Sequence, residues 1–143
     1  MRDTRALTPP IVLIVDDHEE SLAMYAFGLL AMGFLPVTAS TGEEAFARAC
    51  QIRPDAVVAD VSLPDISGLD LARRLRTDVR TKNASIVVLT AQAAPSVRHQ
   101  ADAAGCDRFM VKPCLPDALA VELLDVLVHR HRDPAKAHPH DPS

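Results

Sequence analysis

The chain has 143 residues, of which 48% are hydrophobic and 3% are aromatic, and its formal net charge is −4. This length supports one domain with a buried core and requires no disulfide or structural metal. The acidic balance and the scarcity of aromatic residues exclude the basic stripe and stacking surface of a nucleic-acid binder, so we expect no direct binding to DNA.

The cysteines and the hydropathy indicate a reduced, soluble protein. Cys50, Cys106 and Cys114 are odd in number and show no paired metal-ligand spacing, so we interpret them as reduced core residues. No stretch approaches the roughly 20 apolar residues of a membrane span. We therefore predict a cytoplasmic protein that does not bind a membrane, with a flexible polar N-terminus over residues 1–10.

Five apolar runs alternate with segments in which apolar residues recur at helical spacing. Such βα alternation implies a parallel sheet covered on both faces, joined by right-handed crossovers. The predicted fold class is therefore α/β, with a doubly wound five-stranded sheet. The predicted strands cover 11–15, 34–39, 56–60, 85–90 and 107–111, and helical spacing is found over 22–29, 42–52, 69–75, 96–104 and 119–128.

Local signals mark the ends of these elements. Ser67, with Asp70 three residues later, is predicted to cap a helix N-terminus. Gly33 and Gly105 follow the last periodic residues of two helices, where glycine commonly ends a helix. Pro36 cannot donate to a strand ladder, so its strand is predicted to lie at an edge or to begin irregularly.

The segment 129–143 has no hydrophobic periodicity, and we predict that it is a disordered tail. Its histidines could bind a metal, but they have no structured carboxylate or cysteine partners, which favours a solvated tail. These residues are His129, His131, His138 and His140.

Polar residues stand at the carboxyl ends of the predicted strands: Asp16 and Asp17, then Asp60, Thr90 and Lys112. Taken alone, Asp60 is equally consistent with the start of a turn, where Asp is common. In a parallel sheet, however, all five side chains meet at one edge. Clustered carboxylates repel unless a cation lies among them, and Mg²⁺ takes oxygen ligands together with phosphate oxygens. We expect Mg²⁺, with Mn²⁺ as the alternative, and a phosphate-sized pocket completed by the lysine and the threonine hydroxyl.

Four stretches, in this order and at these strand ends, resemble the receiver domain of bacterial two-component response regulators. The resemblance covers about residues 11–128 and implies a flavodoxin-like (βα)5 fold with strand order 2-1-3-4-5, of the kind found in single-domain chemotaxis regulators. The stretches are Val15-Asp16-Asp17, the loop from Asp60 through Pro64 to Gly68, Thr90-Ala91, and Phe109-Met110-Val111-Lys112-Pro113.

The resemblance implies that Asp60 is the phosphoacceptor, attacking a phosphoryl group carried by a histidine kinase or a histidine phosphotransfer protein. It also implies a set of metal ligands. Asp17 is expected to ligate Mg²⁺ directly, Asp16 through water, Asp60 through its carboxylate and Ser62 through its backbone carbonyl.

The resemblance further implies a conformational switch. The Thr90 hydroxyl is expected to turn toward the new phosphoryl group, and Phe109 to move inward behind it. The Lys112-Pro113 peptide bond is expected to be cis, which directs the lysine ammonium at the phosphoryl oxygens. We assign no chemistry to His18, because polar residues at helix starts are common.

These observations predict a stand-alone response regulator that catalyses only its own phosphorylation and dephosphorylation. Because the chain has no room for an output domain after its last helix, we expect phosphorylation-dependent binding of an unidentified protein to the segment from Pro95 onward. The protein is expected to be a monomer or a phosphorylation-dependent dimer. One alternative is a phosphotransfer intermediate of a multistep phosphorelay. A phosphatase of the haloacid-dehalogenase type is disfavoured, because Ser62 stands where that family has a second aspartate.

Overall fold

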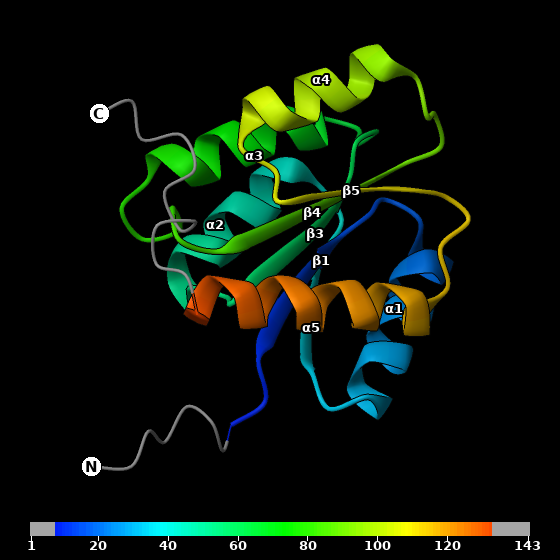
Figure 1. Cartoon of the computed structure of the whole chain (residues 1–143), viewed down its shortest axis with the longest axis vertical. Helices are drawn as coiled ribbons and strands as arrows, with labels where there is room; N and C mark the ends of the chain where they lie inside the picture. Colours follow the sequence, from blue (N-terminus) through cyan, green and yellow to red (C-terminus); the bar gives the residue numbers. More distant parts are fainter. Residues whose placement is uncertain (1–7, 133–143) are drawn as a thin grey trace.

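The computed structural model describes residues 8–132 as a five-stranded parallel sheet with helices on both faces (Figure 1). The strand order β2-β1-β3-β4-β5 confirms the predicted doubly wound fold. Among the described residues, no helix combines the length and the apolar character needed to cross a bilayer. The strands are β1 (Ile11–Val15), β2 (Leu35–Ala39), β3 (Ala56–Asp60), β4 (Ser85–Thr90) and β5 (Arg108–Val111), and the helices are α1 (Glu19–Ala31), α2 (Gly42–Ile52), α3 (Gly68–Thr77), α4 (Pro95–Ala104) and α5 (Pro116–Arg132).

The sheet separates two apolar cores. Helices α2, α3 and α4 cover one face, and α1 and α5 cover the other (Figure 1). Along β1, Leu13 and Val15 belong to the first core, whereas Val12 and Ile14 belong to the second. Both faces of the central strands are therefore buried, which explains why the sequence shows continuous apolar runs without alternation.

The residues predicted to mark the ends of three helices are confirmed. The Ser67 Oγ accepts a hydrogen bond from the Asp70 backbone N–H at 3.0 Å. Gly33 and Gly105 follow α1 and α4 with φ values of 95° and 92°, in the left-handed region that glycine adopts at little cost. The strand that contains Pro36 is β2, at one edge of the sheet.

Two strands begin one residue later than predicted. The Phe34 N–H donates to the Leu29 carbonyl at 3.0 Å, so this residue closes α1 and does not open β2. Asp107 precedes β5, and its Oδ2 accepts hydrogen bonds from the Ile86 N–H at 2.8 Å and from Arg76 at 2.7 Å. The Phe34 hydrogen bond holds that residue outside the ladder. The Asp107 N–H still donates to the Ile86 carbonyl at 2.7 Å, but its side chain takes the place of a backbone acceptor for the Ile86 N–H.

The prediction that disorder begins at residue 129 was wrong, because α5 continues to Arg132. The His129 Nδ1 lies 2.7 Å from the Asp125 carbonyl oxygen and 3.2 Å from its Oδ1, so this histidine does have a carboxylate partner. Such an i,i+4 pair supports the last turns of a helix. His131 lies on the same helix, whereas His138, His140 and residues 1–7 of the predicted flexible N-terminus lie outside the described residues.

The three cysteines are free thiols, as predicted. Cys114 is buried, and Cys50 and Cys106 are partly buried. Burial raises the pKa of the Cys106 thiol to about 12. The thiol form therefore predominates at neutral pH, which keeps this cysteine unreactive.

Arg76 of α3 joins three segments near the amino ends of β4 and β5. Its guanidinium donates to the carbonyl oxygens of Gly105 at 2.9 Å and Lys82 at 2.8 Å, and it pairs with Asp107 at 2.7 Å. The two side chains of the ion pair are 11% and 12% exposed. An ion pair this well buried, in which each guanidinium nitrogen has an acceptor, is costly to break from one side.

We expect Arg76→Met to lower the free energy of unfolding by about 3–5 kcal/mol, because it leaves the Asp107 carboxylate buried without its cation. Arg73→Met is the matched control, since Arg73 pairs with Asp70 at exposures of 49% and 56%. Such an exposed pair contributes about 0–1 kcal/mol. Guanidinium chloride unfolding followed by circular dichroism measures both variants, and equal losses would contradict a special role for Arg76.

Candidate functional site

Acidic side chains from two strand ends meet one lysine at the carboxyl edge of the sheet. Asp60 is the last residue of β3 and is 7% exposed, and Asp16 follows β1 and is 2% exposed. The Lys112 Nζ lies 2.6 Å from the Asp60 Oδ2 and 3.3 Å from the Asp16 Oδ2. The structure therefore brings together residues that lie far apart in the sequence, around a single ammonium group.

The ammonium group of Lys112 is held in its charged form. Burial alone would lower its pKa, but the hydrogen bond and the negative charge of Asp60, together with Asp16, raise the pKa above its ordinary value. Lys112 is therefore protonated at neutral pH. The peptide bond that follows it, to Pro113, is cis, the isomer that the resemblance implies.

Thr90 ends β4 beside this cluster. It is buried, and its carbonyl oxygen accepts a hydrogen bond from the Lys112 N–H at 2.8 Å. Its Oγ1 accepts a hydrogen bond from the Gln92 N–H at 3.1 Å. Because a hydroxyl both accepts and donates, its hydrogen stays available for a further acceptor.

The acids at the end of β1 form a group that could hold a metal ion. Ligand atoms of Asp16, Asp17 and His18 lie within 4.8 Å of one another. The His18 Nδ1 lies 3.1 Å from the Asp16 Oδ1 and 3.2 Å from the Asp17 Oδ1, so the structure brings His18 into contact with both acids. At β3, the Ser62 N–H donates to the Asp60 Oδ1 at 3.0 Å. These carboxylates and the Ser62 carbonyl are hard oxygen donors, the kind that Mg²⁺ and Mn²⁺ prefer.

Asp65 ties the loop after Asp60 to the start of α2, a role that the sequence analysis missed. Its Oδ1 accepts a hydrogen bond from the Gly42 N–H and its Oδ2 accepts one from the Glu43 N–H, both at 2.8 Å. These hydrogen bonds, first from Glu43 and then from Gly42, lower the pKa of the Asp65 carboxyl. No local pattern reveals this contact, because the partners lie more than twenty residues earlier in the chain.

Gly68 allows α3 to begin directly against the end of β3. A Cβ at this position would collide with the backbone of Asp60. The Gly68 N–H also donates to the Val61 carbonyl at 2.8 Å, which closes the loop. The glycine of the loop motif thus has a steric reason that only the packed structure shows.

Tyr25 anchors the segment that follows the cis bond. Its hydroxyl donates to the Cys114 carbonyl oxygen at 2.7 Å, across the α1–α5 core. Tyr25 is the only tyrosine of the chain, and it lies within the stretch 22–29 that the sequence analysis identified by helical spacing alone. The signal that could have identified it is the phenol hydroxyl, which usually finds a partner when buried.

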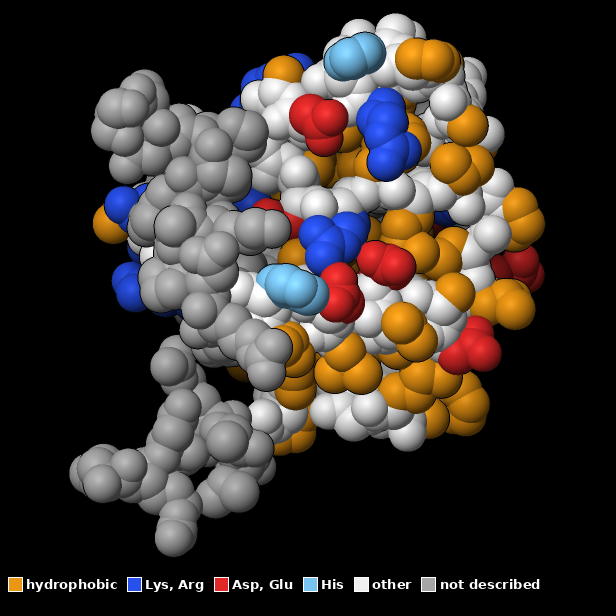
Figure 2. All heavy atoms as spheres, in the orientation of Figure 1, with side chains coloured by type: hydrophobic (Ala, Val, Ile, Leu, Met, Phe, Trp, Pro, Cys, Tyr) orange, Lys and Arg blue, Asp and Glu red, His pale blue; other side chains and the backbone are white. Residues whose placement is uncertain are grey.

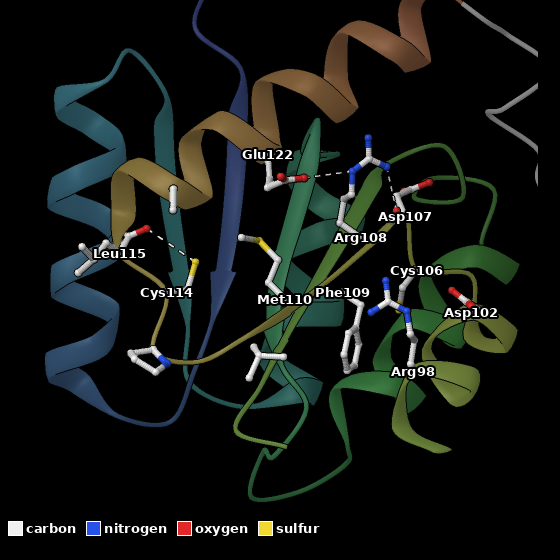
Figure 3. A pocket seen from close by; sticks show the side chains of 13 residues that line it. Arg98, Asp102, Cys106, Asp107, Arg108, Phe109, Met110, Cys114, Leu115 and Glu122 are labelled. Atoms are coloured by element: carbon white, nitrogen blue, oxygen red, sulfur yellow. Dashed lines mark hydrogen bonds and ion pairs between the residues drawn. The ribbon is translucent and has the colours of Figure 1, made fainter. Parts of the chain in front are cut away.

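A groove of about 700 Å³ lies over β5 between α4 and α5 and does not include Asp60 (Figure 3). Figure 2, in the orientation of Figure 1, shows the face that carries α4, β5 and α5, with basic and acidic side chains between the two helices. Arg108 pairs across it with Glu122 at 3.3 Å and with Asp125 at 2.7 Å. The lining includes Arg98 and Asp102 from α4, Phe109 and Met110 from β5, and Ala118 and Glu122 from α5.

Residues 12–124 match the family described as the response regulator receiver domain. The phosphate regulon transcriptional regulatory protein PhoB of Rhizobium meliloti (strain 1021) is 36% identical over 104 residues, which are 73% of this chain and 46% of PhoB. This chain spans about half the length of the transcriptional regulators that it matches.

Two solved structures have the same fold. The chemotaxis response regulator CheY4 of Vibrio cholerae superimposes with a TM-score of 0.77 at 29% identity, covering 84% of this chain and 99% of CheY4. The signal receiver domain of a signal transduction histidine kinase from Syntrophus aciditrophicus gives a TM-score of 0.77 at 26% identity, covering 84% of this chain and 91% of that chain.

We expect Asp65→Asn to speed hydrogen exchange at the Gly42 and Glu43 amides, because the carboxylate that accepts from both is lost. Folding lowers the Asp65 pKa below its ordinary value of 3.8. The Asp65 carboxylate therefore stabilises the folded protein above that pH, and this stabilisation is lost as the pH falls through the folded pKa. The stability difference between wild type and variant should therefore hold at neutral pH and vanish in acid.

Amide exchange by NMR and urea unfolding at several pH values measure the effect of Asp65→Asn. Asp70→Asn is the control, because Asp70 is exposed and pairs only locally with Arg73. Unchanged exchange at Gly42 and Glu43 in Asp65→Asn would show that the carboxylate does not hold the start of α2.

Proposed function

This chain belongs to the response regulator receiver domain family, and we propose that its phosphoacceptor is Asp60. Receiver domains are signalling domains that bind Mg²⁺ at an acidic pocket, and the relatives are response regulators that work with histidine kinases. The observation that carries the proposal is the 2.6 Å contact between the Lys112 ammonium and a carboxylate at the end of a central strand. The donor would be a histidine kinase or a histidine phosphotransfer protein.

In the proposed reaction, a carboxylate oxygen of Asp60 forms a bond to phosphorus as the bond from phosphorus to the donor imidazole nitrogen breaks. Phosphoryl transfer passes through a loose transition state, so the protein contributes mainly position and charge neutralisation. The Ser62 N–H and the Lys112 ammonium each hold one oxygen of the Asp60 carboxylate. Lys112 is also placed to neutralise charge on the transferred group.

The metal would lie among the acids. We propose that Asp17 ligates Mg²⁺ directly and Asp16 through water, and that Asp60 and the Ser62 carbonyl complete the protein ligands. Mn²⁺ is the alternative, because it takes the same oxygen donors. When bound, the ion supplies positive charge to the phosphoryl oxygens.

Signalling would use Thr90 and Phe109. The Thr90 hydroxyl has a hydrogen to donate, and a phosphoryl group carries close to two negative charges at neutral pH. Phe109 lines the groove between α4 and α5, so its movement would change that surface. We propose this groove, within the segment from Pro95 through α5, as the surface that binds the output partner.

A stand-alone regulator and a relay intermediate differ in their partners. Capture on immobilised protein with and without beryllofluoride, an acyl-phosphate mimic, separates them, because a relay should retain a histidine phosphotransfer protein. We propose no enzymatic activity beyond the protein's own phosphorylation and dephosphorylation, and the phosphatase alternative stays disfavoured by Ser62. A cytoplasmic location, the absence of DNA binding, and a monomer or phosphorylation-dependent dimer stay predictions.

Asp60→Asn should reduce phosphate incorporation from acetyl phosphate to background, because the amide keeps the size of the side chain but removes the nucleophile. Chelation of Mg²⁺ should do the same to the wild type. Asp70→Asn, an exposed carboxylate outside the site, is the control. Intact-protein mass spectrometry measures incorporation, and full labelling of Asp60→Asn would place the acceptor elsewhere.

Thr90→Ala should still accept phosphate but should signal poorly. The lost hydrogen bond to a charged acceptor contributes roughly 1.5–3 kcal/mol, so the active form should be populated about tenfold less or worse.

Lys112→Ala should impair both phosphate incorporation and signalling, because the ammonium contacts the carboxylate that reacts. The measurement is phosphate incorporation alongside capture of the partner. A normal response of partner binding to phosphate in Thr90→Ala would reject the hydroxyl switch.

A further inference from the structure

The guanidinium of Arg98 lies over the aromatic ring of Phe109. The Arg98 Cζ is 5.3 Å from the ring centroid, within the range of a cation–π contact (Figure 3). Arg98 is exposed on α4, and within residues 8–132 its guanidinium forms no hydrogen bond or salt bridge, although Asp102 lies one turn further along the same helix. The ring is thus the partner that the structure shows for this charge.

Phe109 connects the groove with the acidic site. On β5 it pairs with Val88 of β4, in the same ladder that pairs Val111 with Thr90, and it lies three residues before Lys112. The ring is partly buried against the core that includes α4 residues such as Ala101. A displacement of the ring away from α4 therefore changes the wall of the groove and separates the ring from Arg98.

We propose that Arg98 restrains Phe109 in the position seen here and thereby opposes activation of the receiver. The inference rests on the proposed function, in which Phe109 moves when Asp60 is phosphorylated. Because phenylalanine has no hydroxyl, only packing and the attraction between ring and cation can hold it on this side. A ligand that favours the displaced ring must break this contact, so removing the contact raises the apparent affinity for that ligand.

The test uses beryllofluoride with Mg²⁺ as the probe and fluorine NMR of the full chain labelled with fluorophenylalanine. The chain has four phenylalanines, and Phe109→Leu assigns the resonance of Phe109 by its loss. In the wild type we expect this resonance to shift as beryllofluoride binds. The midpoint is the beryllofluoride concentration at which half of this shift has occurred. In Arg98→Met the midpoint should fall about two- to fivefold, the effect of losing one exposed cation–π contact. Arg98→Gln, which also lacks the charge, should behave alike.

The chain offers a matched control. Arg74 of α3 lies 4.3 Å from the ring centroid of Phe46 on α2, a second arginine over a phenylalanine ring, and it also pairs with Glu43 at 2.8 Å. Arg74→Met should leave the midpoint unchanged. In a Phe109→Leu background, followed through the remaining phenylalanine resonances, Arg98→Met should also have no effect, because the restraint acts only through the ring.

The outcomes separate the restraint from the function on which it rests. If the wild type responds but Arg98→Met has an unchanged or higher midpoint, the restraint is overturned and the proposed function stands. An equal fall of the midpoint in Arg98→Met and Arg74→Met would also overturn the restraint, because the loss of any positive charge would then explain the effect. If the wild type itself does not respond, the proposed function fails first, as labelling of Asp60 would show independently.

Discussion

The site depends on one contact, the ammonium of Lys112 between the carboxylates of Asp60 and Asp16. Two buried carboxylates this near to each other are unfavourable unless a cation lies with them. The cation comes from the segment after β5, at the far edge of the sheet from β2, while Asp16 follows β1 and Asp60 ends β3. The charge balance can therefore be satisfied only when all of these strands are in place, which couples assembly of the site to completion of the sheet.

The loops that carry the reactive groups are held by partners outside the site. Asp65 fixes the loop after β3 against the start of α2. Gly68, which has no Cβ, lets α3 begin directly against the backbone of Asp60. Tyr25 fixes the segment after the cis bond through the Cys114 carbonyl. Chemistry that relies on positioning gains from such support, because small displacements of reacting groups reduce rates strongly.

Helix α4 is restrained unevenly along its length. Its C-terminal end is fastened by Arg76, which donates to the Gly105 carbonyl and pairs with Asp107. At the other end, Ala94 provides no side-chain cap, and Arg98 meets β5 through the ring of Phe109. The less restrained end is the one that follows Thr90 in the chain. A rearrangement at the carboxyl edge of the sheet can therefore reach the groove while the opposite end of the helix stays anchored.

Local patterns in the sequence predicted the alternating elements, three of their end residues and the meeting of Asp60 with Lys112, because periodicity and turn residues act within a few positions and parallel strands end at one edge. It could not show the α2 partners of Asp65, the ring under Arg98 or the buried pair of Arg76. Those contacts join residues that are distant in sequence, and their geometry depends on how whole helices pack on the sheet. That placement follows from the packing of the whole fold, because no local pattern encodes the distance between two elements.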